Sequence, residues 1–225
     1  MQLVHLPLLH VQREIYALPR GRARFQAYIA RMTGPDGDLR LPLTAMNPMA
    51  HDHVAHSVDG WLAIGAEDAA ARALEEAASD AAATGGEARL QVGLVVADDV
   101  RGGWTNRYTT DFGSRFESQP FLRRGFAVAL LWASELPDLQ VARREALRAC
   151  GRAIWQTTRG FGRSVRELLA QEQFALRLAG ETPKPLPDAR FLEATDPATV
   201  FAVLYGDDGA TALGHPPLGL APALE

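Results

Sequence analysis

Hydrophobic and polar positions along this chain form patterns that predict strands and helices in turn. Two nearly continuous apolar runs, residues 88–97 and 125–133, are typical of strands that are covered on both faces. A shorter apolar run at residues 39–46 also predicts a strand, and Pro42 within it favours an edge position. These runs predict the strands of a small sheet.

Apolar residues spaced three and four apart predict helices in much of the remaining chain. Asn47-Pro48 reads as a helix start, because Asn is a favourable N-cap and Pro fits the first helical position. The buried stripe of that helix would contain Val54, Val58 and Trp61. The other expected helices lie at residues 25–32, 67–84, around Phe112 and Phe116, 138–157, 163–179, and from Asp196-Pro197 to Tyr205-Gly206.

The order strand, helices, strand, crossover, strand, helices predicts an α/β protein. We expect a small, mainly parallel or mixed sheet flanked by helices, in a single domain that spans residues 1–225. The proline-rich stretch 180–188 reads as an extended connector. Because too few residues follow it to build a further domain, we expect them to form a docked, helical C-terminal tail.

Composition narrows the functional classes. The chain is 47% hydrophobic and 22% charged, with a net charge of −4 and a pI of about 5.9. Nucleic-acid binding is therefore not expected, since phosphate recognition needs a basic face. Lys184 is the single lysine among many arginines, and alanine is abundant. This bias fits a GC-rich bacterial genome.

Several features favour a cytoplasmic location. Cys150 is the single cysteine and cannot form an internal disulfide, which fits a reducing compartment, and its position favours burial over reactivity. The N-terminal segment carries His5, Pro7 and His10 among its apolar residues, so we expect no signal peptide. No run reaches the length that a membrane span needs.

Polar side chains follow each predicted strand. Asn47 follows the first strand, Asp98 and Asp99 follow the second, and Glu135 follows the third. In open α/β sheets, ligands bind beyond the carboxyl ends of the strands. We therefore expect a site for a small polar or anionic molecule at this edge, with these carboxylates as candidate acid–base groups.

The long segment after the second strand supplies further candidate ligand contacts. Arg107 could hold a carboxylate or phosphate through two parallel hydrogen bonds, and the expected helix start after Asn47 would present backbone N–H groups to the same anion. The candidate substrate-binding residues are Asn47, Trp104, Thr105, Asn106, Arg107 and Tyr108. A purely structural role, tying a long loop down, is an equal alternative.

The segment from His51 to His56 raises the question of a metal site. On a helix, His51 and His53 would diverge by about 160°, so they could not share an ion. Asp52, His53 and His56 would form a solvated face. His51 is the candidate ligand that remains, and only together with Asp98, Asp99 or Glu135.

Glu172 lies on an apolar helical stripe with Val165, Leu168 and Leu176. A buried carboxylate is costly unless it is paired, and such groups often have functional roles. The alternatives are an ion pair with Arg159 or Arg163, or a stripe rotated by one position that leaves Glu172 at the rim. We carry Glu172 as a candidate catalytic residue.

Three functions remain open. The first is a hydrolase or transferase for a small polar molecule, the second a non-catalytic ligand-binding module, and the third a homo-oligomer or partner-binding protein that docks through residues 183–187 and the apolar tail PPLGLAPAL. The dinucleotide motif Gly-x-Gly-x-x-Gly, the P-loop and the hydrolase elbow Gly-x-Ser-x-Gly are missing. The sequence indicates no cofactor.

Overall fold

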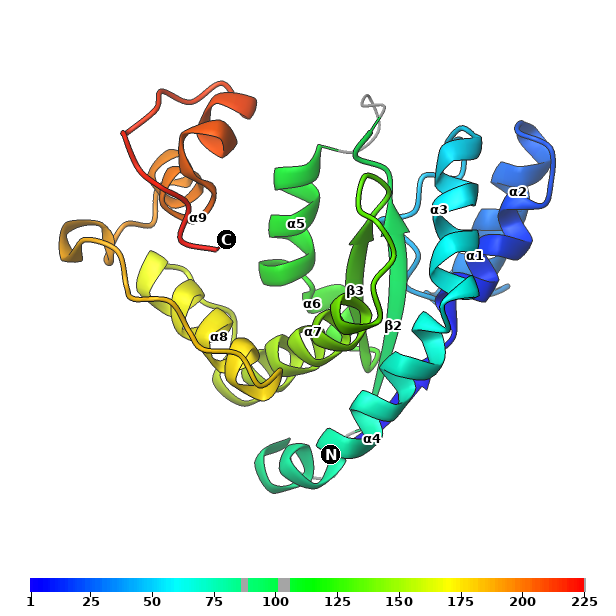
Figure 1. The fold of residues 1–225 in the computed structure, drawn as a ribbon, viewed down its shortest axis with the longest axis horizontal. Helices are drawn as coiled ribbons and strands as arrows, with labels where there is room; N and C mark the ends of the chain where they lie inside the picture. Colours follow the sequence, from blue (N-terminus) through cyan, green and yellow to red (C-terminus); the bar gives the residue numbers. More distant parts are fainter. Residues whose placement is uncertain (86–88, 101–105, 225) are drawn as a thin grey trace.

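The computed structural model describes residues 1–85, 89–100 and 106–224, with the side chains of residues 79–85 outside the description. Strands and helices alternate along the chain in the manner that the hydrophobic pattern predicts (Figure 1). In order they are β1 (Gln2–Leu6), α1 (Leu8–Tyr16), α2 (Arg22–Met32), α3 (Asp52–Ala63), α4 (Ala66–Gly85), β2 (Arg89–Ala97), α5 (Arg107–Phe116), α6 (Gln119–Leu122), β3 (Phe126–Trp132), α7 (Leu139–Arg159), α8 (Val165–Leu178), a short 3-10 helix (Ala189–Phe191) and α9 (Pro197–Ala212).

The three strands form one sheet in the order β1-β2-β3. Both pairings are parallel, with Leu6 level with Gly93 and Ala97 level with Trp132. The carboxyl ends of β2 and β3 therefore meet at one edge, where the segments that follow them lie side by side. The expected α/β fold with a parallel sheet and a helical C-terminal region is confirmed.

The expected position of the first strand is wrong. Residues 39–46 form no strand, and the nearest pairing is an isolated bridge between Thr33 and Leu39. The strand is instead β1, at the N-terminus of the chain. Leu43 and Met46 are fully buried, so the apolar character of this segment reflects a loop that crosses the core.

The expected helix start at Asn47-Pro48 is also wrong. Asn47 accepts a hydrogen bond from the backbone N–H of Met49 at 2.9 Å in a turn, and α3 begins only at Asp52, with His51 in the N-cap position. The buried stripe of that helix is nevertheless confirmed, because Val54, Val58 and Trp61 are all fully buried.

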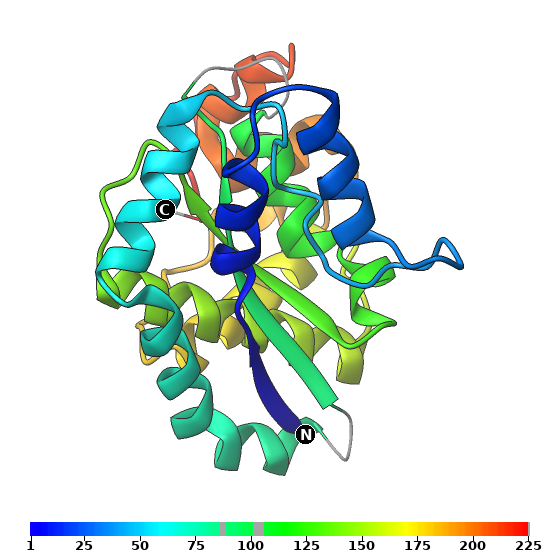
Figure 2. The same ribbon diagram turned by 90° about the vertical axis from the view of Figure 1, so that its right-hand side faces the viewer.

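Helix α1 takes over where β1 ends. β1 pairs with β2 only as far as Gly93, which leaves the later backbone groups of β2 without a strand partner on that side. The fully buried side chain of Gln12 donates to the Val96 carbonyl at 3.0 Å and accepts from the Val96 N–H at 2.8 Å. One amide thus replaces a missing strand residue, as buried backbone groups require. Figure 2 shows α1 following directly on from β1.

Helices enclose the sheet. α4 packs on β1 and α7, α7 packs on β2 and β3, and α5 and α6 contact β3. Figure 1 shows α1, α2 and α3 on one side of the strands and α5, α8 and α9 on the other. The main hydrophobic core lies between the sheet and its covering helices, with Leu94, Leu131 and Ile154 among its fully buried members.

A second, smaller hydrophobic cluster joins the C-terminal helices to α5. Phe116 of α5, Leu168 of α8 and Leu204 of α9 are buried in it together. The chain after α9 folds back on this cluster, where the Leu224 N–H donates to the Leu204 carbonyl at 3.1 Å. A left-handed glycine, Gly206 with φ of 70°, breaks α9 and lets the returning chain approach closely. α5 therefore lies between two cores.

Two further properties are visible in the described residues. Cys150 is buried as expected, and burial raises the pKa of its thiol to about 12. No helix in the described part of the chain is both long and apolar enough to cross a membrane.

Candidate functional site

The two carboxylates that follow β2 point to different neighbours. Asp98 is almost completely buried, and its Oδ1 lies 2.9 Å from Nε2 of His53 on α3. The Tyr16 hydroxyl donates to the Asn47 carbonyl at 2.8 Å nearby, and burial followed by the charge of Asp98 raises the pKa of Tyr16. Asp98 and Asn47 thus lie on the side of the sheet edge that α1 and α3 cover.

Asp99 contacts the end of β3. Its carboxylate accepts from the Ser134 N–H at 3.0 Å, from the Ser134 hydroxyl at 2.6 Å and from Arg107 at 2.8 Å. Arg107 also donates to Glu135 at 2.6 Å and lies over the Trp132 ring. Asp99, Arg107 and Glu135, which sequence reasoning placed at one edge, are therefore brought together.

These contacts change the role expected for Arg107. Both terminal nitrogens of its guanidinium bond carboxylates, one to Asp99 and one to Glu135. A guanidinium between two carboxylates is already neutralised, so it presents little positive charge to a ligand anion. The backbone N–H groups expected after Asn47 are also missing from this place, because no helix starts there.

The other candidate ligand contacts have local structural roles. Asn106 is the N-cap of α5, and its side chain accepts from the Thr109 N–H at 3.2 Å. The Tyr108 ring packs edge-on against Tyr205 of α9 at 5.6 Å between centroids. Trp104 and Thr105 lie outside the described residues.

The histidines of α3 do not gather around a common point. His51 is exposed at the N-cap of the helix, and Asp52 and His56 are exposed as expected. His53 departs from the expected solvated face, because it is partly buried against Asp98. Over residues 1–85, 89–100 and 106–224, no group of three His, Cys, Asp or Glu side chains is arranged to hold a metal ion.

Glu172 is buried on the core-facing side of α8, as its position among leucines predicts. Its partners are neither Arg159 nor Arg163. Arg152 of α7 donates to its two oxygens from 2.9 Å, and Arg115 of α5 donates from 2.7 Å. Burial alone would raise the pKa of the Glu172 carboxyl, but the charges of Arg152 and Arg115 outweigh it and lower the pKa to about 2.

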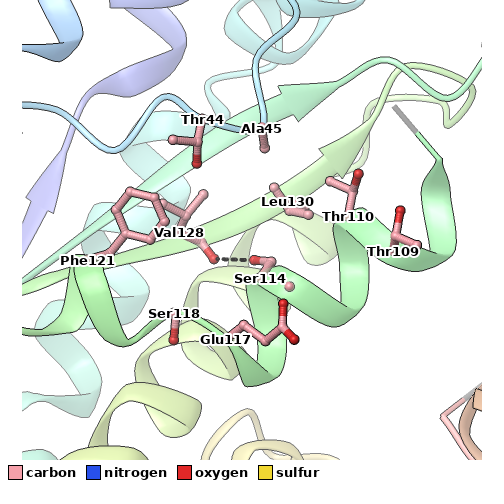
Figure 3. Close-up of a pocket in the computed structure, with 11 residues that line it drawn as sticks. Thr44, Ala45, Thr109, Thr110, Ser114, Glu117, Ser118, Phe121, Val128 and Leu130 are labelled. Carbon is pink, nitrogen blue, oxygen red and sulfur yellow. Dashed lines mark hydrogen bonds between the residues drawn. The ribbon is translucent and has the colours of Figure 1, made fainter. Parts of the chain in front are cut away.

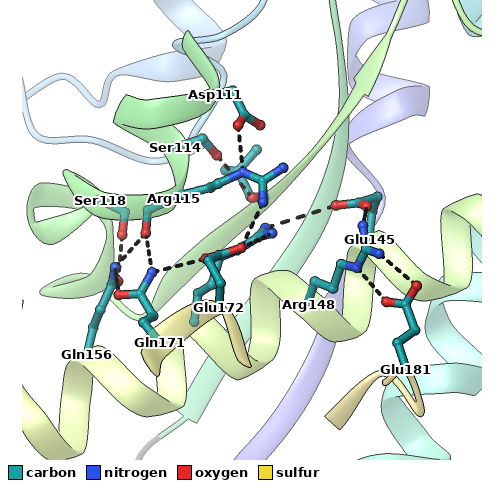
Figure 4. Close-up of polar contacts among 12 residues, drawn as sticks. Asp111, Ser114, Arg115, Ser118, Glu145, Arg148, Gln156, Gln171, Glu172 and Glu181 are labelled. Carbon is teal, nitrogen blue, oxygen red and sulfur yellow. Dashed lines mark hydrogen bonds and ion pairs between the residues drawn. The ribbon is translucent and has the colours of Figure 1, made fainter. Parts of the chain in front are cut away.

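This pair of contacts belongs to a continuous network, which we call the α5–α7–α8 ion network (Figure 4). Arg115 also pairs with Asp111 at 2.6 Å, and its carbonyl accepts from Gln156 at 2.7 Å and Gln171 at 2.8 Å. The network's members are Asp111, Arg115, Glu145, Arg148, Arg152, Gln156, Gln171, Glu172 and Glu181. Since each charge meets an opposite one, the network is a structural element that joins three helices.

A cavity of about 270 Å³ lies on another side of α5, between that helix, β3 and residues 44–45 (Figure 3). We call it the α5 cavity. Five hydroxyl side chains and one carboxylate surround an apolar floor. Its lining residues are Thr44, Ala45, Thr109, Thr110, Gly113, Ser114, Glu117, Ser118, Phe121, Val128 and Leu130.

Some polar groups of the α5 cavity are occupied and others are not. The hydroxyl of Ser114 lies 3.5 Å from the Val128 carbonyl, and that of Ser118 donates to Gln156 at 2.8 Å. In the part of the chain that the structure describes, the hydroxyls of Thr44 and Thr110 and the carboxylate of Glu117 have no hydrogen-bond or ion-pair partner. These three groups remain available to a ligand.

Sequence reasoning missed the α5 cavity, although a signal was present. Thr110, Ser114 and Ser118 recur at intervals of four residues, and Phe112 and Phe116 lie about 200° away on the same helix. This pattern describes an amphipathic helix whose polar face carries small hydroxyls in place of charges. We expected the helix itself, but assigned ligand contacts to the segment before it.

The fold and the cavity together define an α/β protein with a three-stranded parallel sheet and a hydroxyl-lined cavity beside its last strand. Comparisons of the chain with protein-family models, with curated proteins and with solved structures find no match. A functional assignment therefore depends on the chemistry of the residues themselves.

Proposed function

We propose that this protein binds a small polyhydroxylated molecule, of the size of a monosaccharide, in the α5 cavity. The observation that carries the proposal is the set of unpaired groups above an apolar floor: the hydroxyls of Thr44 and Thr110 and the carboxylate of Glu117. Sugar hydroxyls donate well to a carboxylate and exchange hydrogen bonds with threonine hydroxyls. The apolar face of the ring would pack on Val128, as ligand sites commonly provide.

An uncharged ligand suits this cavity better than the anion considered from the sequence. The charge in its lining comes from Glu117, which would repel an anion. Arg107, the residue expected to hold an anion, does not line the cavity and is paired with Asp99 and Glu135. The polar part of the earlier expectation is kept, and the anionic part is not.

Binding without chemistry is favoured over hydrolase or transferase activity. General acid–base catalysis needs titratable groups within reach of the ligand, and Asp98, Asp99 and Glu135 do not line the cavity. Glu172 is engaged by two arginines. For the partner-binding alternative, the apolar tail is already packed on α9 of its own chain, through Leu220, Ala223 and Leu224.

Isothermal titration of the full chain with D-ribose, D-glucose and myo-inositol tests the proposal. We expect at least one of them to bind with a 1:1 ratio, and Thr110→Val and Glu117→Gln each to weaken that binding about tenfold, since each removes a hydrogen-bonding group from the ligand. Thr211→Val, an exposed threonine on α9, is the matched control. No binding by any of the three compounds, or equal binding by the variants, would overturn the proposal.

We also propose a bacterial cytoplasmic location. The bias of the sequence toward arginine and alanine supports a GC-rich bacterial source, and the buried, unpaired Cys150 suits a reducing compartment. Fractionation of cells that express the protein would test this, and recovery from the periplasm would contradict it.

A further inference from the structure

A second cavity, of about 390 Å³, lies between α5, α8 and the start of α9. We call it the aromatic cavity. Phe112, Phe116 and Phe201 form its wall, with the rings of Phe112 and Phe201 stacked at 4.6 Å and those of Phe112 and Phe116 at 5.1 Å. Its volume is within the range of small-molecule sites, and its aromatic wall suits an apolar group.

Two charged side chains of opposite sign line the same cavity. Arg163, in the segment between α7 and α8, supplies a guanidinium, and Glu117, after the end of α5, supplies a carboxylate. They are not within ion-pair distance of each other, and neither pairs with another charge in the described residues. The exposed Thr195 adds a hydroxyl from the residue before the N-cap of α9.

From this arrangement we infer that the aromatic cavity is a binding site for a free hydrophobic α-amino acid. Such a molecule carries one anionic group, one cationic group and one apolar side chain, and the lining offers a complement to each. Arg163 would bind the carboxylate through charge-assisted hydrogen bonds, and Glu117 would bind the ammonium group. The side chain would pack against Phe112 and Phe201.

A zwitterion suits the lining better than a singly charged ligand. A simple carboxylate would use Arg163 and leave Glu117 close to its apolar part, and a simple amine would do the reverse. Burying apolar surface beside an unpaired charge partly desolvates that charge at a cost in free energy. Only a ligand with both charges satisfies both side chains.

Isothermal titration of the full chain with L-phenylalanine, 3-phenylpropionate and phenethylamine tests the inference. L-phenylalanine is expected to bind with a 1:1 ratio, and the two analogues, each lacking one charge, to bind about tenfold or more weakly. Equal binding of the three compounds, or no binding of L-phenylalanine, would overturn the inference.

Charge-specific variants identify the two contacts. Arg163→Gln should weaken L-phenylalanine binding about tenfold or more and leave phenethylamine unchanged, because that analogue has no carboxylate. Glu117→Gln should weaken L-phenylalanine and leave 3-phenylpropionate no weaker. Arg166→Gln is the matched control, since Arg166 is exposed on α8 and pairs with Glu193. An Arg163→Gln protein that binds L-phenylalanine normally would contradict the assignment.

The two sites can be tested separately although Glu117 lines both. Thr110 belongs to the α5 cavity alone, and Arg163 belongs to the aromatic cavity alone. Thr110→Val should therefore affect sugar binding and not L-phenylalanine, and Arg163→Gln the reverse. Failure of one proposal leaves the other standing.

Discussion

Helix α5 carries two polar regions that differ in how fully their groups are paired. In the α5–α7–α8 ion network, Arg115 meets Asp111 and Glu172, and Glu172 in turn meets Arg152. In the α5 cavity, one residue earlier along the helix and onward, Thr110 and Glu117 have no partner within the described parts of the chain. Paired groups stabilise the fold, whereas unpaired ones remain free to bind a ligand.

The difference corrects a common inference about buried ionisable residues. Glu172 drew attention in the sequence because a carboxylate on an apolar stripe is often functional. Its two arginine partners keep it ionised and fully engaged, so it has no free oxygen to offer a substrate. The ordinary threonines and serines of α5, which drew no attention, form the more suitable site.

The largest expected effect comes from breaking the ion network at its centre. Glu172→Gln leaves Arg115 and Arg152 buried without their shared counter-charge, and we expect unfolding free energy to fall by about 3–5 kcal/mol. Urea denaturation followed by circular dichroism measures the change. Glu193→Gln, which breaks the exposed pair with Arg166, should have little effect. Equal losses in the two variants would contradict the distinction.

A pH titration of stability should show an intermediate effect. The folded-state pKa of Glu172 is lowered to about 2, below its value of about 4.3 in an unfolded chain. Its contribution is therefore complete above about pH 4.3 and is lost as the pH falls toward 2. The difference in unfolding free energy between the natural protein and Glu172→Gln should shrink over this interval. A difference that stays constant from pH 5 to pH 2 would show that Glu172 is not ionised in the folded protein.

The smallest expected effect on stability comes from the cavity. Thr110→Val removes a hydroxyl that has no partner in the described residues and keeps nearly the same shape, so the unfolding free energy should change by less than about 0.5 kcal/mol. Thermal unfolding and urea denaturation both measure this. A loss as large as that of Glu172→Gln would mean that the hydroxyl has a structural role and is not free for a ligand.

Local patterns predicted most of the elements. The runs at 88–97 and 125–133 became β2 and β3, and the alanine-rich stretch became α4, because continuous apolar runs and helical spacing act over a few neighbouring residues. The run at 39–46 failed for the same reason. Its apolar residues are buried, but burial by itself does not distinguish a strand from a loop that crosses a core.

Contacts between distant residues were predicted less well. The sequence placed Asp99, Arg107 and Glu135 at one sheet edge, and parallel pairing of β2 with β3 brings them together. It proposed Arg159 and Arg163 for Glu172, yet Arg159 lies over the Trp155 ring and Arg163 lines the aromatic cavity. The actual partner Arg115 is 57 residues away along the chain, in the crossover.

The sequence alone therefore determined the fold class, the two inner strands, most of the helices and the burial of Glu172 and Cys150, because spacing and hydrophobicity are local properties. Only the tertiary structure decided which arginines neutralise which carboxylates and where unpaired groups remain. Those outcomes depend on how helices far apart in the chain pack, and a carboxylate is either engaged or available according to the neighbour that packing supplies.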